Sequence, residues 1–211
     1  MENEKYLRDL SEIKKMMNSS SRFISLSGLA GVFAGCYAII GAVIAGFLLS
    51  EQASNTNKVS ELVIFGDINL IDQLFYLALA VLVLAIGTAI ALTTYKAKRN
   101  NKKIWDSTSK RLMINFSAPL FAGGIFCLVL LQNEMVQLLV PSMLIFYGLA
   151  LIHASKYTYS DLKYLGYTNL VLGLISTQFP AYGLYFWTAG FGLFHILYGI
   201  WMYNKYERKP E

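Results

Sequence analysis

Residues 112–155 read LMINFSAPLFAGGIFCLVLLQNEMVQLLVPSMLIFYGLALIHAS. This stretch is too long for one transmembrane helix, which needs about 20 apolar residues to cross a bilayer. Near its middle it contains a polar run, Gln132-Asn133-Glu134. We therefore predict two transmembrane helices, 112–131 and 135–155, joined by a tight turn.

Four further helices follow from the same reading of the rest of the chain. A second double-length apolar stretch, 164–204, is interrupted around Pro180, and proline disfavours helix at the residue before it. The predicted spans are 23–49, 74–94, 112–131, 135–155, 162–178 and 181–203. Only 15% of the residues are charged, against roughly 25% in a soluble domain. The sequence thus predicts an all-α polytopic membrane protein, a six-helix bundle whose transmembrane domain covers residues 23–204.

The lysines and arginines predict how these helices are oriented. All 18 of them except Lys58 lie in segments on one side of the predicted membrane. Segments rich in Lys and Arg remain in the cytoplasm. We therefore expect both terminal segments, 1–22 and 205–211, to be cytoplasmic.

Two of the cytoplasmic segments indicate contacts outside the bilayer. Residues 1–18 carry apolar side chains at helical spacing between charged ones, which is typical of an amphipathic helix on a membrane surface. The loop 96–111 is strongly basic. Both segments favour a cytoplasmic protein partner. Because the positive charge lies beside apolar spans, it indicates a membrane surface and no nucleic-acid partner.

The first predicted span carries small residues along one face. The row consists of Gly31, Gly35, Ala38, Ala42 and Gly46. Small residues let helix backbones approach closely in lipid, where packing holds helices together. The row therefore predicts either a central position for this helix in the bundle or a homodimer interface.

The interiors of the predicted spans contain no Asp, Glu, Lys or Arg. Ion-coupled transporters, pumps and voltage sensors typically place ionisable residues inside the membrane. The sequence therefore disfavours these classes.

Polar residues gather instead in the cytoplasmic half of the predicted spans. There we expect a polar cavity that opens to the cytoplasm and binds a small anionic or lipidic ligand. Its candidate lining residues are Arg22, Ser27, Arg111, Asn115, Tyr147, His153, Asn169 and His195. The alternative is that these side chains only hydrogen-bond between helices.

His153 and His195 are the two histidines, and they raise the question of a haem or metal site. In the predicted helices they differ in depth by about six residues, or about 9 Å along the axis. Two ligands of one haem or metal would need to be nearly level. No third histidine or set of spaced carboxylates accompanies them, and no catalytic motif appears. We therefore expect no cofactor, no metal and no enzymatic activity.

The run Ser20-Ser21-Arg22-Phe23-Ile24-Ser25-Leu26-Ser27-Gly28 precedes and opens the first predicted span. It resembles the same region of small, functionally uncharacterised six-helix inner-membrane proteins of Bacteroidetes-type bacteria. The resemblance implies a bacterial inner membrane. It implies no activity and no site residues.

These features favour a membrane sensor that binds a ligand or lipid in a cytoplasm-facing polar cavity. An uncoupled small-molecule transporter or channel is the alternative. A b-type haem protein or membrane enzyme is a third reading, which the histidine spacing disfavours. The expected partners are the lipid bilayer, the ligand, a cytoplasmic protein and a second copy of the chain.

Overall fold

The computed structural model describes residue 6 and residues 22–55, 68–99 and 105–208. Most of the predicted amphipathic segment 1–22 and parts of the loop 96–111 and the tail 205–211 lie outside these ranges. The helices are α2 (Gly28–Asn55), α4 (Ile68–Arg99), α5 (Ser107–Gln132), α6 (Leu139–Ala154), α7 (Leu162–Ser176), α8 (Gly183–Trp187) and α9 (Phe194–Tyr206). A π-helix, η3 (Thr188–Leu193), joins α8 to α9, and two 3-10 turns, η1 (Val136–Leu138) and η2 (Pro180–Tyr182), precede α6 and α8. The prediction of an all-α fold is confirmed, since the described ranges contain no strand.

Five of the helical segments are long and apolar enough to cross a membrane. They are Gly28–Glu51, Leu70–Arg99, Ser107–Gln132, Val136–Ala154 and Pro180–Tyr206. The remaining predicted span, 162–178, corresponds to α7, which has 15 residues. At 1.5 Å per residue it is about 22 Å long, shorter than the roughly 30 Å of hydrocarbon in a bilayer. The chain is thus consistent with a membrane protein, and its six crossings remain a prediction.

Local signals explain where α5 begins and ends. Asp106 accepts a hydrogen bond from the backbone N–H of Ser109, and the Asp106 N–H donates to the Ser109 hydroxyl, which forms a capping box. α5 therefore starts before the predicted residue 112. At its other end Glu134 adopts a left-handed conformation with φ of 60°, and Met135 N–H donates to Leu130 O. This turn separates α5 from α6 where the polar run predicted a break.

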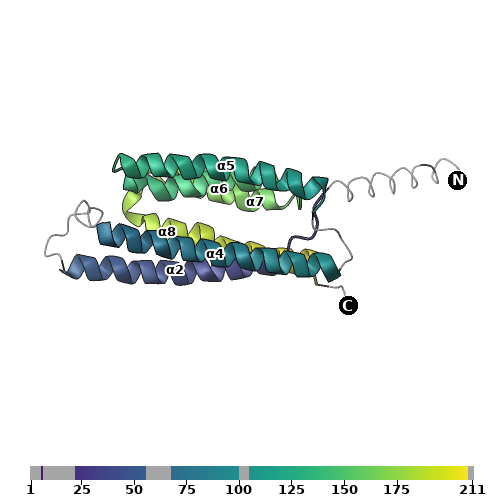
Figure 1. Cartoon of the computed structure of the whole chain (residues 1–211), viewed down its shortest axis with the longest axis horizontal. Coiled ribbons are helices and arrows are strands. Elements are labelled where there is room, and N and C mark those ends of the chain that lie inside the picture. The colour runs from purple at the N-terminus through teal and green to yellow at the C-terminus, as the bar shows by residue number, and fades with distance from the viewer. Residues whose placement is uncertain (1–5, 7–21, 56–67, 100–104, 209–211) are drawn as a thin grey trace.

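The helices form two layers (Figure 1). In one layer α2 packs between α4 and the η3–α9 segment, and in the other α6 packs between α5 and α7. We call them the α2 layer and the α6 layer. The packing between layers runs mainly from α8, η3 and α9 to α6 and α7.

Glycines hold each layer together. A Cβ added at Gly148 of α6 would lie 2.7 Å from both Gly166 O and Leu170 N of α7. A Cβ added at Gly199 of α9 would lie 2.7 Å from Gly28 O of α2. Both distances are below normal contact, so these backbones approach each other as closely as glycine permits.

Successive helices run in opposite directions, so the starts of α2, α5 and α7 share one end with the last residues of α4, α6 and α9 (Figure 1). We call this the basic end. It holds every Lys and Arg in the described ranges: Arg22, Lys96, Lys98, Arg99, Lys110, Arg111, Lys156, Lys163, Lys205 and Arg208. The opposite, acidic end carries Glu51, Asp72 and Glu134.

We predict that Gly148→Ala lowers the free energy of unfolding by roughly 1–3 kcal/mol, because the new methyl group meets backbone atoms of α7. The matched control is Gly124→Ala, since no atom of the described residues outside the neighbouring backbone of α5 lies within 4 Å of a Cβ added there. Alanine is favoured over glycine in a helix by about 0.5–1 kcal/mol, so this variant should unfold no more easily than wild type. Denaturant unfolding in detergent compares them, and equal loss in both variants would contradict close α6–α7 packing.

Candidate functional site

Three sets of residues join the two layers, and the first lies at the basic end. Residues 22–27, which we call the strap, lie outside any helix although residues 23–27 belong to the first predicted span. The strap contacts the turn between α6 and α7 through three hydrogen bonds. Phe23 N–H donates to Tyr157 O at 2.8 Å, the Thr158 hydroxyl donates to Phe23 O at 2.6 Å, and the Tyr159 hydroxyl donates to Ile24 O at 2.6 Å.

The strap is also bound to its own layer. The Lys96 ammonium of α4 donates to Leu26 O at 2.7 Å and pairs with the Glu207 carboxylate at 3.3 Å. That carboxylate accepts hydrogen bonds from the Ser27 hydroxyl and from the backbone N–H of Gly28. A carboxylate at this position is favourable because the start of a helix carries a partial positive charge. The strap is therefore fixed on both sides.

A direct contact between the layers lies beside the strap. Asp161, at the start of α7, accepts hydrogen bonds from Lys205 and Tyr206 of α9. The rings of Tyr206 and Tyr159 pack together with their centroids 4.2 Å apart. Partial burial acts to raise the pKa of Asp161, but the hydrogen bonds from Lys205 and Tyr206 outweigh it and hold that pKa below its usual value.

The second set is a buried polar cluster halfway along the layers. The Tyr147 hydroxyl of α6 lies 2.7 Å from His195 Nε2 of α9, and His195 Nδ1 lies 2.8 Å from Gly190 O. A carbonyl oxygen can only accept, so Nδ1 of a neutral imidazole carries the proton and Nε2 accepts from Tyr147. Both ring nitrogens are thus engaged, and ligation of a metal or haem by His195 would require breaking one of these bonds.

Asn169 completes this cluster from α7. Its side chain is fully buried, and its amide nitrogen donates to Leu165 O of its own helix. Its oxygen Oδ1 has no hydrogen-bond partner in the described structure and lies 2.8 Å from where a Cβ on Gly190 would be. The π-helix η3 therefore approaches α7 as closely as a glycine allows.

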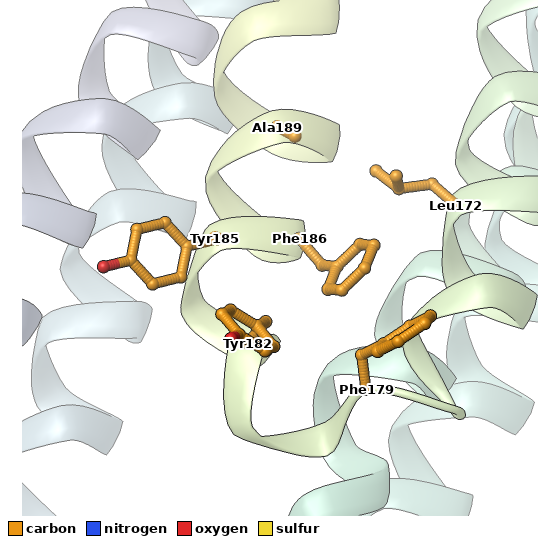
Figure 2. Close-up of a pocket in the computed structure, with 6 residues that line it drawn as sticks. All are labelled: Leu172, Phe179, Tyr182, Tyr185, Phe186 and Ala189. Atoms are coloured by element: carbon orange, nitrogen blue, oxygen red, sulfur yellow. The ribbon is translucent and has the colours of Figure 1, made fainter.

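The third set forms an open groove of about 460 Å³ towards the acidic end. Figure 2 shows Phe179 and Phe186 close to one another, with Leu172 of α7 across the groove. The six lining residues are Leu172, Phe179, Tyr182, Tyr185, Phe186 and Ala189. None of them carries a charge or an amide side chain, so the groove suits an apolar ligand.

The structure brings together three of the eight residues predicted to line a polar cavity. Tyr147, His195 and Asn169 lie at the seam between the layers. The other five lie elsewhere: Ser27 binds Glu207, Asn115 donates to Arg111 O within α5, and Arg22, Arg111 and His153 are exposed. His153 and His195 make no contact that would let them act as a pair.

The small-residue row of the first span faces the rest of the chain. Gly31 lies against Gly199 and His195 O, Gly35 lies against Gly192 O, and Gly46 approaches Leu184. Ala38 and Ala42 are buried. The row is thus covered by α8, η3 and α9.

Sequence reasoning did not identify Lys96, Thr158, Tyr159, Asp161 or Glu207 as residues that join the layers. The only signal was the concentration of hydroxyl and carboxylate groups in the turn 155–161. The sequence shows most of the groove residues only as aromatic side chains around the turn predicted at Pro180.

We predict that Tyr159 titrates well above an ordinary tyrosine. Burial, together with the negative charges of Glu207 and of ionised Tyr206, raises the pKa of Tyr159 to about 12, against about 10 for an exposed tyrosine. A raised pKa means that the folded state prefers the protonated phenol, so this contribution to stability is complete below about pH 10 and is lost as the pH rises towards 12. The difference in tyrosinate absorbance between wild type and Tyr159→Phe measures this pKa, and a midpoint near 10 would contradict the burial of Tyr159 beside Glu207.

Comparisons of the chain with protein-family models, with curated proteins and with solved structures find no match. A functional assignment therefore depends on the geometry of these three sets of residues.

Proposed function

We propose that the chain is an integral membrane protein that crosses the inner membrane of a bacterial cell six times, with both termini in the cytoplasm. Five helices are long and apolar enough to span, and α7 runs the chain from the basic end towards the acidic end beside α6. The clustering of the described lysines and arginines at one end supports a cytoplasmic basic end.

We further propose that this protein acts without catalysis as a lipid-binding membrane sensor. The observation that supports lipid binding is the open apolar groove between α7 and α8. Its volume falls within the range of about 300–1,000 Å³ that is common for small-molecule sites. The polar residues at the seam lie packed against each other, so the apolar groove is the better candidate for a ligand than a polar cavity.

The acyl chain of a membrane lipid fits this groove best. Burying each CH₂ group of a chain contributes about 0.8 kcal/mol where it leaves water. In the bilayer an acyl chain is already out of water, so its binding free energy would come from packing against the Phe179 and Phe186 rings. These rings line the groove next to the short helix α7. Exposed Tyr182 and Tyr185 would then lie near the lipid headgroups, where tyrosine is enriched.

An uncoupled transporter is the second candidate, and the order of helix contacts favours it. In the first half of the chain α2 packs against α4 of its own half and α9 of the other. In the second half α6 packs against α7 of its own half and α5 of the other. Halves related in this way are common in transporters with inverted repeats. Movement of a labelled phospholipid across reconstituted vesicles would favour transport over sensing.

We predict that the purified protein retains a phospholipid and that Ala189→Trp lowers this retention at least about tenfold, because the indole fills the groove. A tenfold loss corresponds to about 1.4 kcal/mol of binding free energy. Native mass spectrometry of protein exchanged from vesicles of phosphatidylethanolamine and phosphatidylglycerol into detergent measures the retained lipid.

The matched control is Val171→Trp, which places the same side chain at an exposed position of α7 that does not line the groove. It should retain lipid like wild type. Equal retention in Ala189→Trp and wild type would rule out the groove as the lipid site.

A further inference from the structure

The two layers are held more tightly within themselves than against each other. Within a layer, backbones meet directly at Gly148 and Gly166 or at Gly28 and Gly199. The peripheral helices α4 and α5 pack mainly on α2 and α6 of their own layers. Each layer is therefore packed as a unit.

A close approach between the layers lies at Gly190 in η3. A Cβ added there would collide with the Leu144 side chain of α6 and would lie 2.8 Å from Asn169 Oδ1 of α7. The six residues of η3 form a π-helix, and π-helical turns occur frequently at functional sites. This contact joins η3 of the α2 layer to α6 and α7 of the other layer.

At the basic end the contact has a different character. The strap has no regular secondary structure. Three of its backbone carbonyl groups accept hydrogen bonds from side chains: Thr158 donates to Phe23 O, Tyr159 to Ile24 O and Lys96 to Leu26 O. The Thr158 and Tyr159 hydroxyls come from the turn between α6 and α7, where Thr158 is fully buried and Tyr159 is half-buried. The Tyr147–His195 bond instead joins α6 to α9 within the length of the helices.

We propose that the strap, together with the Asp161–Lys205 ion pair, is a latch that holds the two layers together at the basic end. Its release lets the layers separate there while the contact at Gly190 and the packing of α8 on α6 and α7 keep the acidic end closed. This inference does not depend on lipid binding in the groove.

Charge makes the latch reversible. The α2 layer presents Arg22, Lys98, Arg99 and Arg208 at the basic end, and the α6 layer presents Lys110, Arg111, Lys156 and Lys163. Like charges on the two layers repel each other. Asp161 opposes this repulsion, because it lies in the α6 layer and binds Lys205 of the α2 layer. Glu207 opposes it by neutralising Lys96 beside the strap.

Spin labels on both layers test the latch. Lys98→Cys at the end of α4 and Lys110→Cys at the start of α5 introduce exposed labelling sites, with Cys36→Ser and Cys127→Ser removing the native thiols. Pulsed electron–electron double resonance in nanodiscs then measures the distance between the two labels, and hence between the layers at the basic end. We expect Thr158→Val with Tyr159→Phe to add a longer, broader distance population, because two of the three bonds from the α6–α7 turn to the strap are lost.

Three comparisons make the outcome decisive. Tyr164→Phe removes a hydroxyl from an exposed tyrosine at the same end and should leave the distance unchanged. Labels at Glu51→Cys and Met135→Cys report the acidic end, which should stay closed in every variant. If the double variant does not fold, Asp161→Asn alone should produce the longer population through loss of the ion pair. An unchanged basic-end distance in a folded latch variant would overturn the proposal, and equal lengthening at both ends would also do so.

Discussion

Close approach of helix backbones at glycine is the constraint on which the rest of the structure depends. In a bilayer the hydrophobic effect does not drive one apolar helix onto another, so helices associate where small residues let many atoms touch. The Gly148–Gly166 contact joins α6 to α7, and the Gly28–Gly199 contact joins α2 to α9. These two contacts divide the chain into two layers, and every other candidate feature lies where the layers meet.

Depth decides which kind of contact joins the layers. In the interior, Tyr147 and His195 satisfy each other because an unpaired polar group there has no water to bind. At the basic end, lysine and arginine side chains are exposed, and the strap binds through hydroxyl, ammonium and carboxylate groups. Towards the acidic end the helix α7 is short, and aromatic side chains from the following turn line an open groove. One seam therefore combines a buried polar centre, a hydrogen-bonded polar end and an apolar groove.

Much of this architecture can be read from the sequence because it follows local rules. Long apolar runs predict the helices, and the polar run at Gln132-Asn133-Glu134 predicts the turn in which Glu134 has a positive φ. The small-residue row predicts that α2 packs closely against another helix. Tyr147, Asn169 and His195 can be selected as interior polar residues since each interrupts an apolar run.

The rest depends on contacts between residues far apart in the chain. The run Phe23–Ser27 continues the apolar stretch of the first predicted span, so the sequence places it in that helix. In the structure its backbone instead binds Tyr157, Thr158 and Tyr159, more than 100 positions away. Depth along a helix also says nothing about direction around it. Asn115 and His153 lie at the predicted depth, yet the rotation of α5 and α6 points them away from the seam. The groove was not predictable because it forms from the spacing of α7 and α8 in three dimensions.

The central claim is that the chain crosses the membrane with its basic end in the cytoplasm, and α7 is the helix that tests it most directly. Ser160→Cys and Gln178→Cys, in a chain without its native thiols, place single cysteines just before and just after α7. A membrane-impermeant thiol reagent applied to sealed vesicles of known orientation should label position 160 only from the cytoplasmic side and position 178 only from the opposite side. Labelling of both positions from the same side would mean that α7 does not cross, and it would contradict the six-span account.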